Sequence, residues 1–142
     1  MPLAPGHAPL SAAARKLRRA LFLLVGAGLL IAAVPVTLHI RAFVRYADKA
    51  AGVVVHLNAG GSHPEIQFTP VSGDAISFPA GGFIFNYAPG DEVTVIYDRA
   101  APRATAKIDT PASVWFLPIA LGLGGFVFFL FGLIDPKESG AG

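Results

Sequence analysis

Two long apolar runs stand out in the pattern of hydrophobic and polar positions. Residues 20–40 and 114–134 contain no Asp, Glu, Lys or Arg. At ~1.5 Å per residue, a helix of this length crosses the ~30 Å hydrocarbon core of a bilayer. Trp115 and Phe116 begin the second run, where an interfacial aromatic belt is expected. The pattern predicts two transmembrane helices, over residues 20–40 and 113–134.

A cleaved signal peptide is the alternative for the first run. The apolar core of a signal peptide usually covers ~7–15 residues and is followed by a small-residue cleavage site. The run over residues 20–40 is longer, and residues 34–38 offer no convincing site. An uncleaved helix is therefore favoured. Ser11 is its expected N-cap, because good helix formers follow it.

Between the two runs the hydrophobic period changes from helical to alternating, which is typical of half-buried strands. Turn residues divide this region at intervals close to ten residues. Six short strands are predicted, over residues 52–57, 64–69, 75–78, 81–86, 92–97 and 104–108. Such strands favour an antiparallel meander closed into a small barrel or sandwich. The expected fold class is a membrane α+β protein with a β domain over residues 52–112.

Alternation also predicts which side chains of the β domain face its core. One residue in two should point inward along each strand, because successive side chains of a strand point to opposite faces. The expected inward set is Val53, Val55, Ile66, Phe68, Val93 and Val95.

The distribution of charge predicts the orientation in the membrane. The net charge is +2, and the N-terminal 19 residues carry Arg15, Lys16, Arg18 and Arg19 with no acidic residue. Basic residues concentrate on the cytoplasmic side of a first membrane helix. We therefore expect a cytoplasmic leader over residues 1–19, a β domain outside the plasma membrane and a cytoplasmic tail over residues 135–142.

Composition narrows the class of protein further. Hydrophobic residues make up 54% of the chain and charged residues 14%, with a mean hydropathy of +0.59; soluble proteins average ~25% charged residues. The absence of cysteine excludes disulfides and thiolate metal sites. No nucleic-acid partner is expected, because the basic excess is one local cluster rather than a basic face with interleaved aromatics.

Three basic residues follow the first apolar run at helical spacing. Arg41, Arg45 and Lys49 lie at i, i+4 and i+8, which places them in one stripe if the helix extends through residues 41–51. The side chains can reach lipid headgroups, or they can dock an acidic partner or anionic lipid.

Small residues four apart occur in both apolar runs. Gly28 and Ala32 form such a pair in the first, and Ala120 and Gly124 form one in the second. This spacing lets membrane helices approach closely. We expect the two helices to pack on each other or on a partner subunit.

Candidate catalytic chemistry is sparse. The clustered carboxylates are Asp91, Glu92 and Asp98, and the first and last follow strands or turns where Asp commonly bonds the backbone. His56 and His63 flank a turn without an obvious third metal ligand. No cofactor and no metal are expected. The alternative is a membrane-anchored hydrolase or ligand-binding domain that uses these carboxylates with His56.

The arrangement resembles the bacterial domain-of-unknown-function family 3592. Residues 51–54 match the entry to its β domain, residues 64–68 its central strand, and residues 87–98 its most characteristic segment, with Pro102 and Ala104 following. Arg99 departs from the pattern, since a proline usually follows the aspartate, and residues 80–82 form a longer Gly-rich insert. The resemblance implies a membrane-anchored, extracytoplasmic β domain with no catalytic residues.

These observations favour a non-enzymatic membrane protein whose outer β domain binds another envelope protein. A domain of about 60 residues buries only ~60% of its unfolded surface, and this one has no disulfide to help. Support from a partner, a homo-oligomer or the membrane surface is therefore expected. An accessory subunit of an envelope complex and an immunity-type protein that intercepts a toxin both fit.

Overall fold

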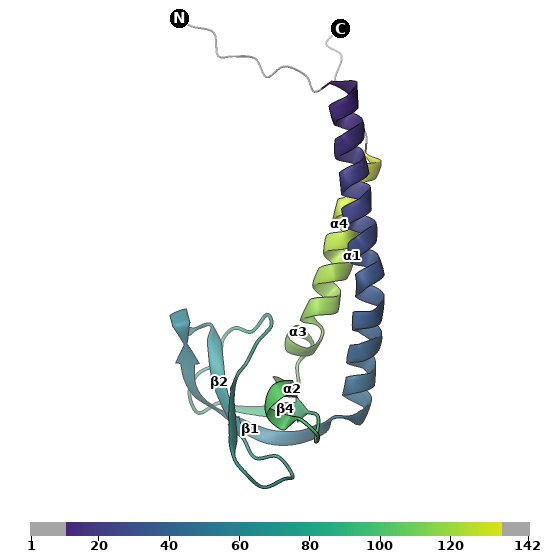
Figure 1. Cartoon of the computed structure of the whole chain (residues 1–142). Coiled ribbons are helices and arrows are strands. Elements are labelled where there is room, and N and C mark those ends of the chain that lie inside the picture. The colour runs from purple at the N-terminus through teal and green to yellow at the C-terminus, as the bar shows by residue number, and fades with distance from the viewer. Residues whose placement is uncertain (1–10, 135–142) are drawn as a thin grey trace, which may run out of the picture. The chain divides into compact units, whose positions relative to one another are not determined.

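The computed structural model describes residues 11–134 (Figure 1). The first ten residues of the predicted leader and the whole predicted tail, residues 135–142, lie outside this range. Two compact units divide the chain: one contains Ala33–Ala120, and the other is formed by the segments before and after it.

Both apolar runs form helices. Helix α1 covers Ala12–Tyr46, and α4 covers Phe116–Leu133. The Ser11 hydroxyl accepts a hydrogen bond from the Ala14 backbone N–H (3.2 Å), which confirms the predicted N-cap. Pro35 lies inside α1 without ending it. The helix stops at Tyr46, so the predicted extension to residue 51 is too long.

In the unit that contains residues 12–32 and 121–134, α1 and α4 pack closely at glycines. A Cβ atom added to Gly26 would lie 2.5 Å from the backbone nitrogen of Phe129, and one added to Gly125 would lie 3.0 Å from the carbonyl oxygen of Gly26. The rings of Phe22 and Phe128 approach with centroids 5.6 Å apart. Only glycine permits backbones to come this near.

The predicted packing residues are not those at the closest approach. A Cβ atom on Gly28 would meet no atom within 4 Å, and one on Gly124 would make an ordinary contact with Leu29 at 3.9 Å. Ala32 and Ala120 are exposed. The reason is helical phase, since Gly28 lies roughly 200° around the helix axis from Gly26.

The β domain contains one antiparallel sheet, which curls into an open half-barrel (Figure 1). Its strands are β1 (Asp48–Asn58), β2 (His63–Phe68), β3 (Ile76–Pro79), β4 (Glu92–Tyr97) and β5 (Lys107–Ile108). The strand order is β3-β2-β1-β4-β5, so the long strand β1 is central and β4 returns to pair with it. The fold is neither a simple meander nor a sandwich, and the edges β3 and β5 leave the barrel open.

Five strands form instead of the predicted six. Residues 81–86 form an irregular loop, although Phe83 and Phe85 are exposed and Ile84 is buried as alternation predicts. The strand expected over residues 104–108 is reduced to β5, because the short helix α2 (Pro102–Thr105) precedes it. A second short helix, α3 (Pro111–Val114), and the 3-10 turn η1 (Ala59–Gly61) complete the domain.

The predicted inward face of β1 is wrong by one residue. Val54 is 1% exposed, whereas Val55 is 39% exposed and Val53 is half-buried. Gly52 also faces the core, where an added Cβ atom would lie 2.7 Å from the Val95 side chain. Three consecutive valines give two equally apolar faces, so alternation alone cannot choose between them. A β-bulge between Val54 and His56 then shifts the register.

The inward positions on β2 and β4 follow the prediction more closely. Ile66, Phe68 and Val95 are at most 2% exposed, and Val93 packs partly buried against the core. Phe68 contacts Tyr97 with ring centroids 5.1 Å apart. The buried Tyr97 hydroxyl accepts a hydrogen bond from the Val71 backbone N–H (3.0 Å), so its polar atom is satisfied.

Candidate functional site

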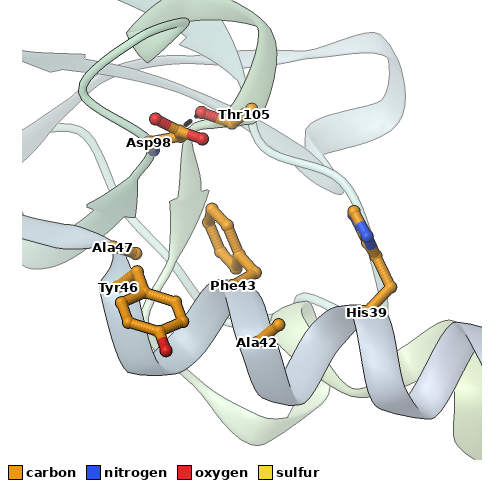
Figure 2. Close-up of a pocket in the computed structure, with 7 residues that line it drawn as sticks. All are labelled: His39, Ala42, Phe43, Tyr46, Ala47, Asp98 and Thr105. Atoms are coloured by element: carbon orange, nitrogen blue, oxygen red, sulfur yellow. Dashed lines mark hydrogen bonds between the residues drawn. The ribbon is translucent and has the colours of Figure 1, made fainter.

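A cavity of about 290 Å³ lies between the last turns of α1 and the segment after β4 (Figure 2). Its lining residues are His39, Ala42, Phe43, Tyr46, Ala47, Asp98 and Thr105. Figure 2 shows the His39 ring and the Asp98 carboxylate on different walls. The hydrogen bond drawn there runs from the Asp98 backbone N–H to the Thr105 hydroxyl (2.8 Å). The cavity therefore brings no acid and base into contact.

Two of the candidate carboxylates accept hydrogen bonds from the backbone of the turns in which they lie. The Asp98 Oδ1 atom accepts a hydrogen bond from the Ala100 backbone N–H (2.8 Å), and the Asp91 Oδ2 atom accepts one from the Ala88 backbone N–H (2.8 Å). The interpretation of both aspartates as turn residues is confirmed. Such bonds fix the backbone of the two turns.

The alternative enzymatic function needs His56 beside Asp91, Glu92 or Asp98. In the described part of the chain, His56 instead lies with its Nε2 atom 3.0 Å from the Asn58 Oδ1 atom. Residues 11–134 contain no group of three His, Asp or Glu side chains placed to hold a metal ion. The structure does not assemble the residues that the hydrolase hypothesis requires.

A hydrogen-bonded polar row crosses three strands of the sheet. Glu65 on β2 is its centre: its Oε1 atom accepts from the Ser77 hydroxyl on β3 (2.6 Å), and its Oε2 atom accepts from the Asn58 side-chain amide on β1 (3.2 Å). His56 extends the row through Asn58. We call these four residues, His56, Asn58, Glu65 and Ser77, the polar row.

Hydrogen bonding stabilises the charged form of Glu65. The Ser77 hydroxyl is the largest cause that holds the pKa of this carboxyl below its ordinary value of 4.5, and the Asn58 amide and the nearby His56 and Arg103 act in the same direction. Because the folded pKa is lowered, this contribution to stability is present above about pH 4.5 and is lost as the pH falls through the folded pKa.

The pH dependence of Glu65 gives a measurable prediction. Glu65→Gln removes the charge and should lower the free energy of unfolding by about 1 kcal/mol at neutral pH. It should also flatten the loss of stability between about pH 5 and pH 3. Thermal unfolding of the full chain in mild detergent measures both effects. Glu92→Gln, at an exposed carboxylate, is the matched control, and equal acid sensitivity of the two variants would contradict the prediction.

The predicted basic stripe is divided by the end of α1. Arg41 and Arg45 are exposed on the helix, but Lys49 lies on β1, where its Nζ atom pairs with the Asp109 Oδ2 atom at 2.6 Å. The helix ends two residues before Asp48, where β1 begins and pairs with Tyr97 of β4. The prediction that all three basic residues lie on one helix is therefore wrong. A headgroup or partner contact through Arg41 and Arg45 stays a prediction.

Arg99, at the position where the resembled family usually has proline, has a structural role. Its Nε and Nη2 atoms donate to the two carboxylate oxygens of Asp48 (2.7 and 3.2 Å), which joins the turn after β4 to the start of β1. The pKa of Asp48 is lowered chiefly by this hydrogen bond. Both side chains are partly solvated, so the pair fixes geometry more than it adds stability.

Sequence reasoning missed the centre of the polar row. Glu65 was visible only as a polar position between apolar ones in residues 64–69, and Ser77 had no distinguishing neighbour. A polar residue on the outer face of each of three adjacent strands is a signal only once the register is known. The pairing of Glu65 with His56 and Pro79 supplies that register.

Comparison with known proteins gives one relative of high similarity. The chain is 45% identical over 121 residues to a protein of Pseudomonas aeruginosa described as "Immune protein Tsi4", and the match covers 83% of this chain and 79% of that protein. No protein-family model matches the chain, so the resemblance to family 3592 stays a prediction. No solved structure matches it.

Proposed function

This chain belongs to the family of the immune protein Tsi4, and on that basis we propose that it is an immunity protein. In this proposal two transmembrane helices anchor it, and its β domain outside the cytoplasm binds and neutralises a protein toxin. The observation that carries the proposal is the 45% identity, which extends over 83% of the chain.

The exposed apolar surface of α1 and α4 supports the membrane anchor. Both helices are long and apolar enough to cross a bilayer, and only 6% and 17% of their most apolar stretches are buried inside the protein. Leu24, Ile31 and Phe131 are 60–71% exposed. A core helix of a soluble protein would bury such side chains, whereas lipid covers them at no cost.

Binding rather than catalysis fits the described residues. The carboxylates in turns are bonded to backbone, and His56 is bonded within the polar row. A toxin-binding protein needs a stable surface and no reactive group. The sheet, with its ordered side-chain hydrogen bonds, supplies such a surface.

Purification of the tagged full chain in mild detergent tests the proposal. A single protein should be recovered with it, identified by mass spectrometry. When that protein is produced outside the cytoplasm, it should stop the growth of cells that lack this chain and spare cells that produce it. A recovered protein that harms neither strain would support an accessory subunit and contradict the immunity role.

A matched pair of variants separates the β domain from the anchor in this experiment. Phe68→Ala removes a core side chain and should abolish protection. Val55→Ala changes the exposed face of β1 and should preserve protection. Protection by both variants to the same degree would show that the β domain is not the neutralising part.

The proposed topology makes a separate prediction. An alkaline phosphatase reporter, which is active only outside the cytoplasm, should be active when fused at Gly61, in the exposed turn between β1 and β2. The same reporter fused at Gly142 should be silent, because the basic cluster of residues 15–19 keeps the N-terminus inside and two spans return the C-terminus there. The reverse pattern would overturn the orientation.

A further inference from the structure

The loop over residues 81–86 exposes two aromatic rings. Phe83 and Phe85 are 61% and 56% exposed, while Ile84 between them is 4% exposed and belongs to the core. The two exposed rings pack edge to face with centroids 4.8 Å apart. The loop therefore presents one compact aromatic surface, which is anchored from below by Ile84.

This loop is attached to the segment that leads into α4. The Phe83 backbone N–H donates to the carbonyl oxygen of Ala112 (3.2 Å), and the Ser113 hydroxyl donates to the carbonyl oxygen of Gly81 (3.2 Å). Gly82 adopts a φ of +103°, and a Cβ atom there would lie 3.0 Å from both the Ala112 oxygen and the Ser113 Cα atom. Helix α3, to which the loop is bound, ends two residues before α4 begins.

The aromatic surface is continuous with the first turn of α4. The Phe83 ring stacks on the ring of Phe116, the first residue of α4, with centroids 6.1 Å apart and an interplanar angle of 14°. Phe116 is itself 43% exposed. If α4 spans the bilayer, Phe116 lies at the boundary between water and hydrocarbon, and Phe83 lies at the same depth.

The composition of the loop favours lipid over a protein partner as the occupant of this surface. No charged residue occurs between Asp74 and Asp91, so no ionised group opposes burial in the headgroup region. Aromatic side chains are the residues that membrane interfaces select. Protein interfaces, in contrast, combine aromatic anchors with Arg and a polar rim, and the loop has no basic residue.

We propose that the loop over residues 81–86 inserts Phe83 and Phe85 into the interfacial region of the outer leaflet, beside the start of α4. This inference rests on the proposed membrane function. The β domain would then be held against the bilayer at a second point besides the helices, which would restrict how it can tilt and which of its faces a partner can reach.

Tryptophan fluorescence in lipid vesicles tests the inference. Trp115 is the only tryptophan, so a Trp115→Phe background lets a single new tryptophan report its surroundings. Phe83→Trp and Phe85→Trp are made separately in the full chain, which is reconstituted in phosphatidylethanolamine and phosphatidylglycerol vesicles with or without lipids brominated near the headgroup. Both variants should show blue-shifted emission and strong quenching by the brominated lipid.

Two control positions keep the outcomes distinct. Val71→Trp, on the exposed loop between β2 and β3 (70% exposed), should be unquenched, and Leu123→Trp, within α4 (63% exposed), should be quenched by lipids brominated deep in the acyl chain. Quenching at residue 123 without quenching at residues 83 and 85 would overturn the inference and leave the membrane anchor intact. No quenching at residue 123 would overturn the anchor itself.

A protein partner would give a different signal. If tryptophan at residue 83 emits as a water-exposed group in vesicles and shifts to the blue only when the co-purified protein is added, the loop docks that protein. This result would also contradict the lipid inference.

Discussion

Phe68→Ala should unfold the β domain. Phe68 is 2% exposed and packs against both Phe78 and Tyr97, with ring centroids 5.7 and 5.1 Å away. Truncating a core phenylalanine costs ~3–5 kcal/mol through lost burial and the cavity left behind. A small domain without disulfides has a stability at the low end of ~5–15 kcal/mol. The variant should therefore lose most protease resistance and most of its cellular abundance.

Two neighbouring valines provide the control for this prediction. Val54→Ala and Val55→Ala remove the same atoms from adjacent positions, but Val54 is 1% and Val55 is 39% exposed. Val54→Ala should cost ~1–3 kcal/mol, which is the cost of two buried methyl groups, and Val55→Ala should be close to neutral. Limited proteolysis of the detergent-solubilised chain measures all three variants. Equal loss in both valine variants would place the core on the wrong face of β1.

Gly26→Leu should separate α1 from α4. A Cβ atom at this position would already lie 2.5 Å from the Phe129 backbone nitrogen, and backbone cannot move aside as a flexible side chain can. Overpacking typically costs ~1–3 kcal/mol, and more where the obstacle is rigid. Gly28→Leu, two residues away on the same helix, meets nothing within 4 Å of its Cβ position and should leave the pair intact.

Cross-linking measures this difference directly. The chain has no native cysteine, and a Cβ atom on Gly124 would lie 3.9 Å from the Leu29 side chain. Leu29→Cys with Gly124→Cys should therefore react with a short bifunctional thiol reagent within one chain. The product should persist with Gly28→Leu and disappear with Gly26→Leu. A product of equal yield in both backgrounds would mean that the helices do not meet at Gly26.

Much of the architecture was predictable because it depends on local patterns. The two uncharged runs predicted both helices correctly, since an apolar run of that length has few stable secondary structures other than a helix. Ser11, with helix formers after it, marked the start of α1, and Asp91 and Asp98 were correctly interpreted as turn residues. Each of these features is decided by neighbours within a few positions of the chain.

The predictions of strand face and strand position failed where the local sequence fits two structures equally well. Residues 53–55 are all valine, so the inward face of β1 depended on where the strand begins and on the bulge beside His56. Residues 81–86 alternate like a strand, yet their hydrogen bonds go to α3 through Phe83 and Gly81 rather than to another strand. In both places a distant segment decides the outcome.

The candidate site shows the same division. The sequence shows which residue types the polar row contains. Glu65 can hydrogen-bond to both Ser77 and Asn58, however, only because β2 lies between β1 and β3 in one particular register. Arg99 and Asp48 are likewise far apart in the chain and are joined by the pairing of β1 with β4.

The sequence by itself determined two apolar helices and an antiparallel β region between them, and its lack of cysteine excluded thiolate ligands, because hydrophobic period and residue type act locally. Tertiary structure alone decided that β4 returns to β1, that Gly26 rather than Gly28 meets α4, and that Phe83 stacks on Phe116. These contacts join residues distant in the chain, and their geometry depends on helical phase and strand register. A shift of one residue turns every side chain to the other face of a strand, so such contacts cannot be inferred from composition or spacing.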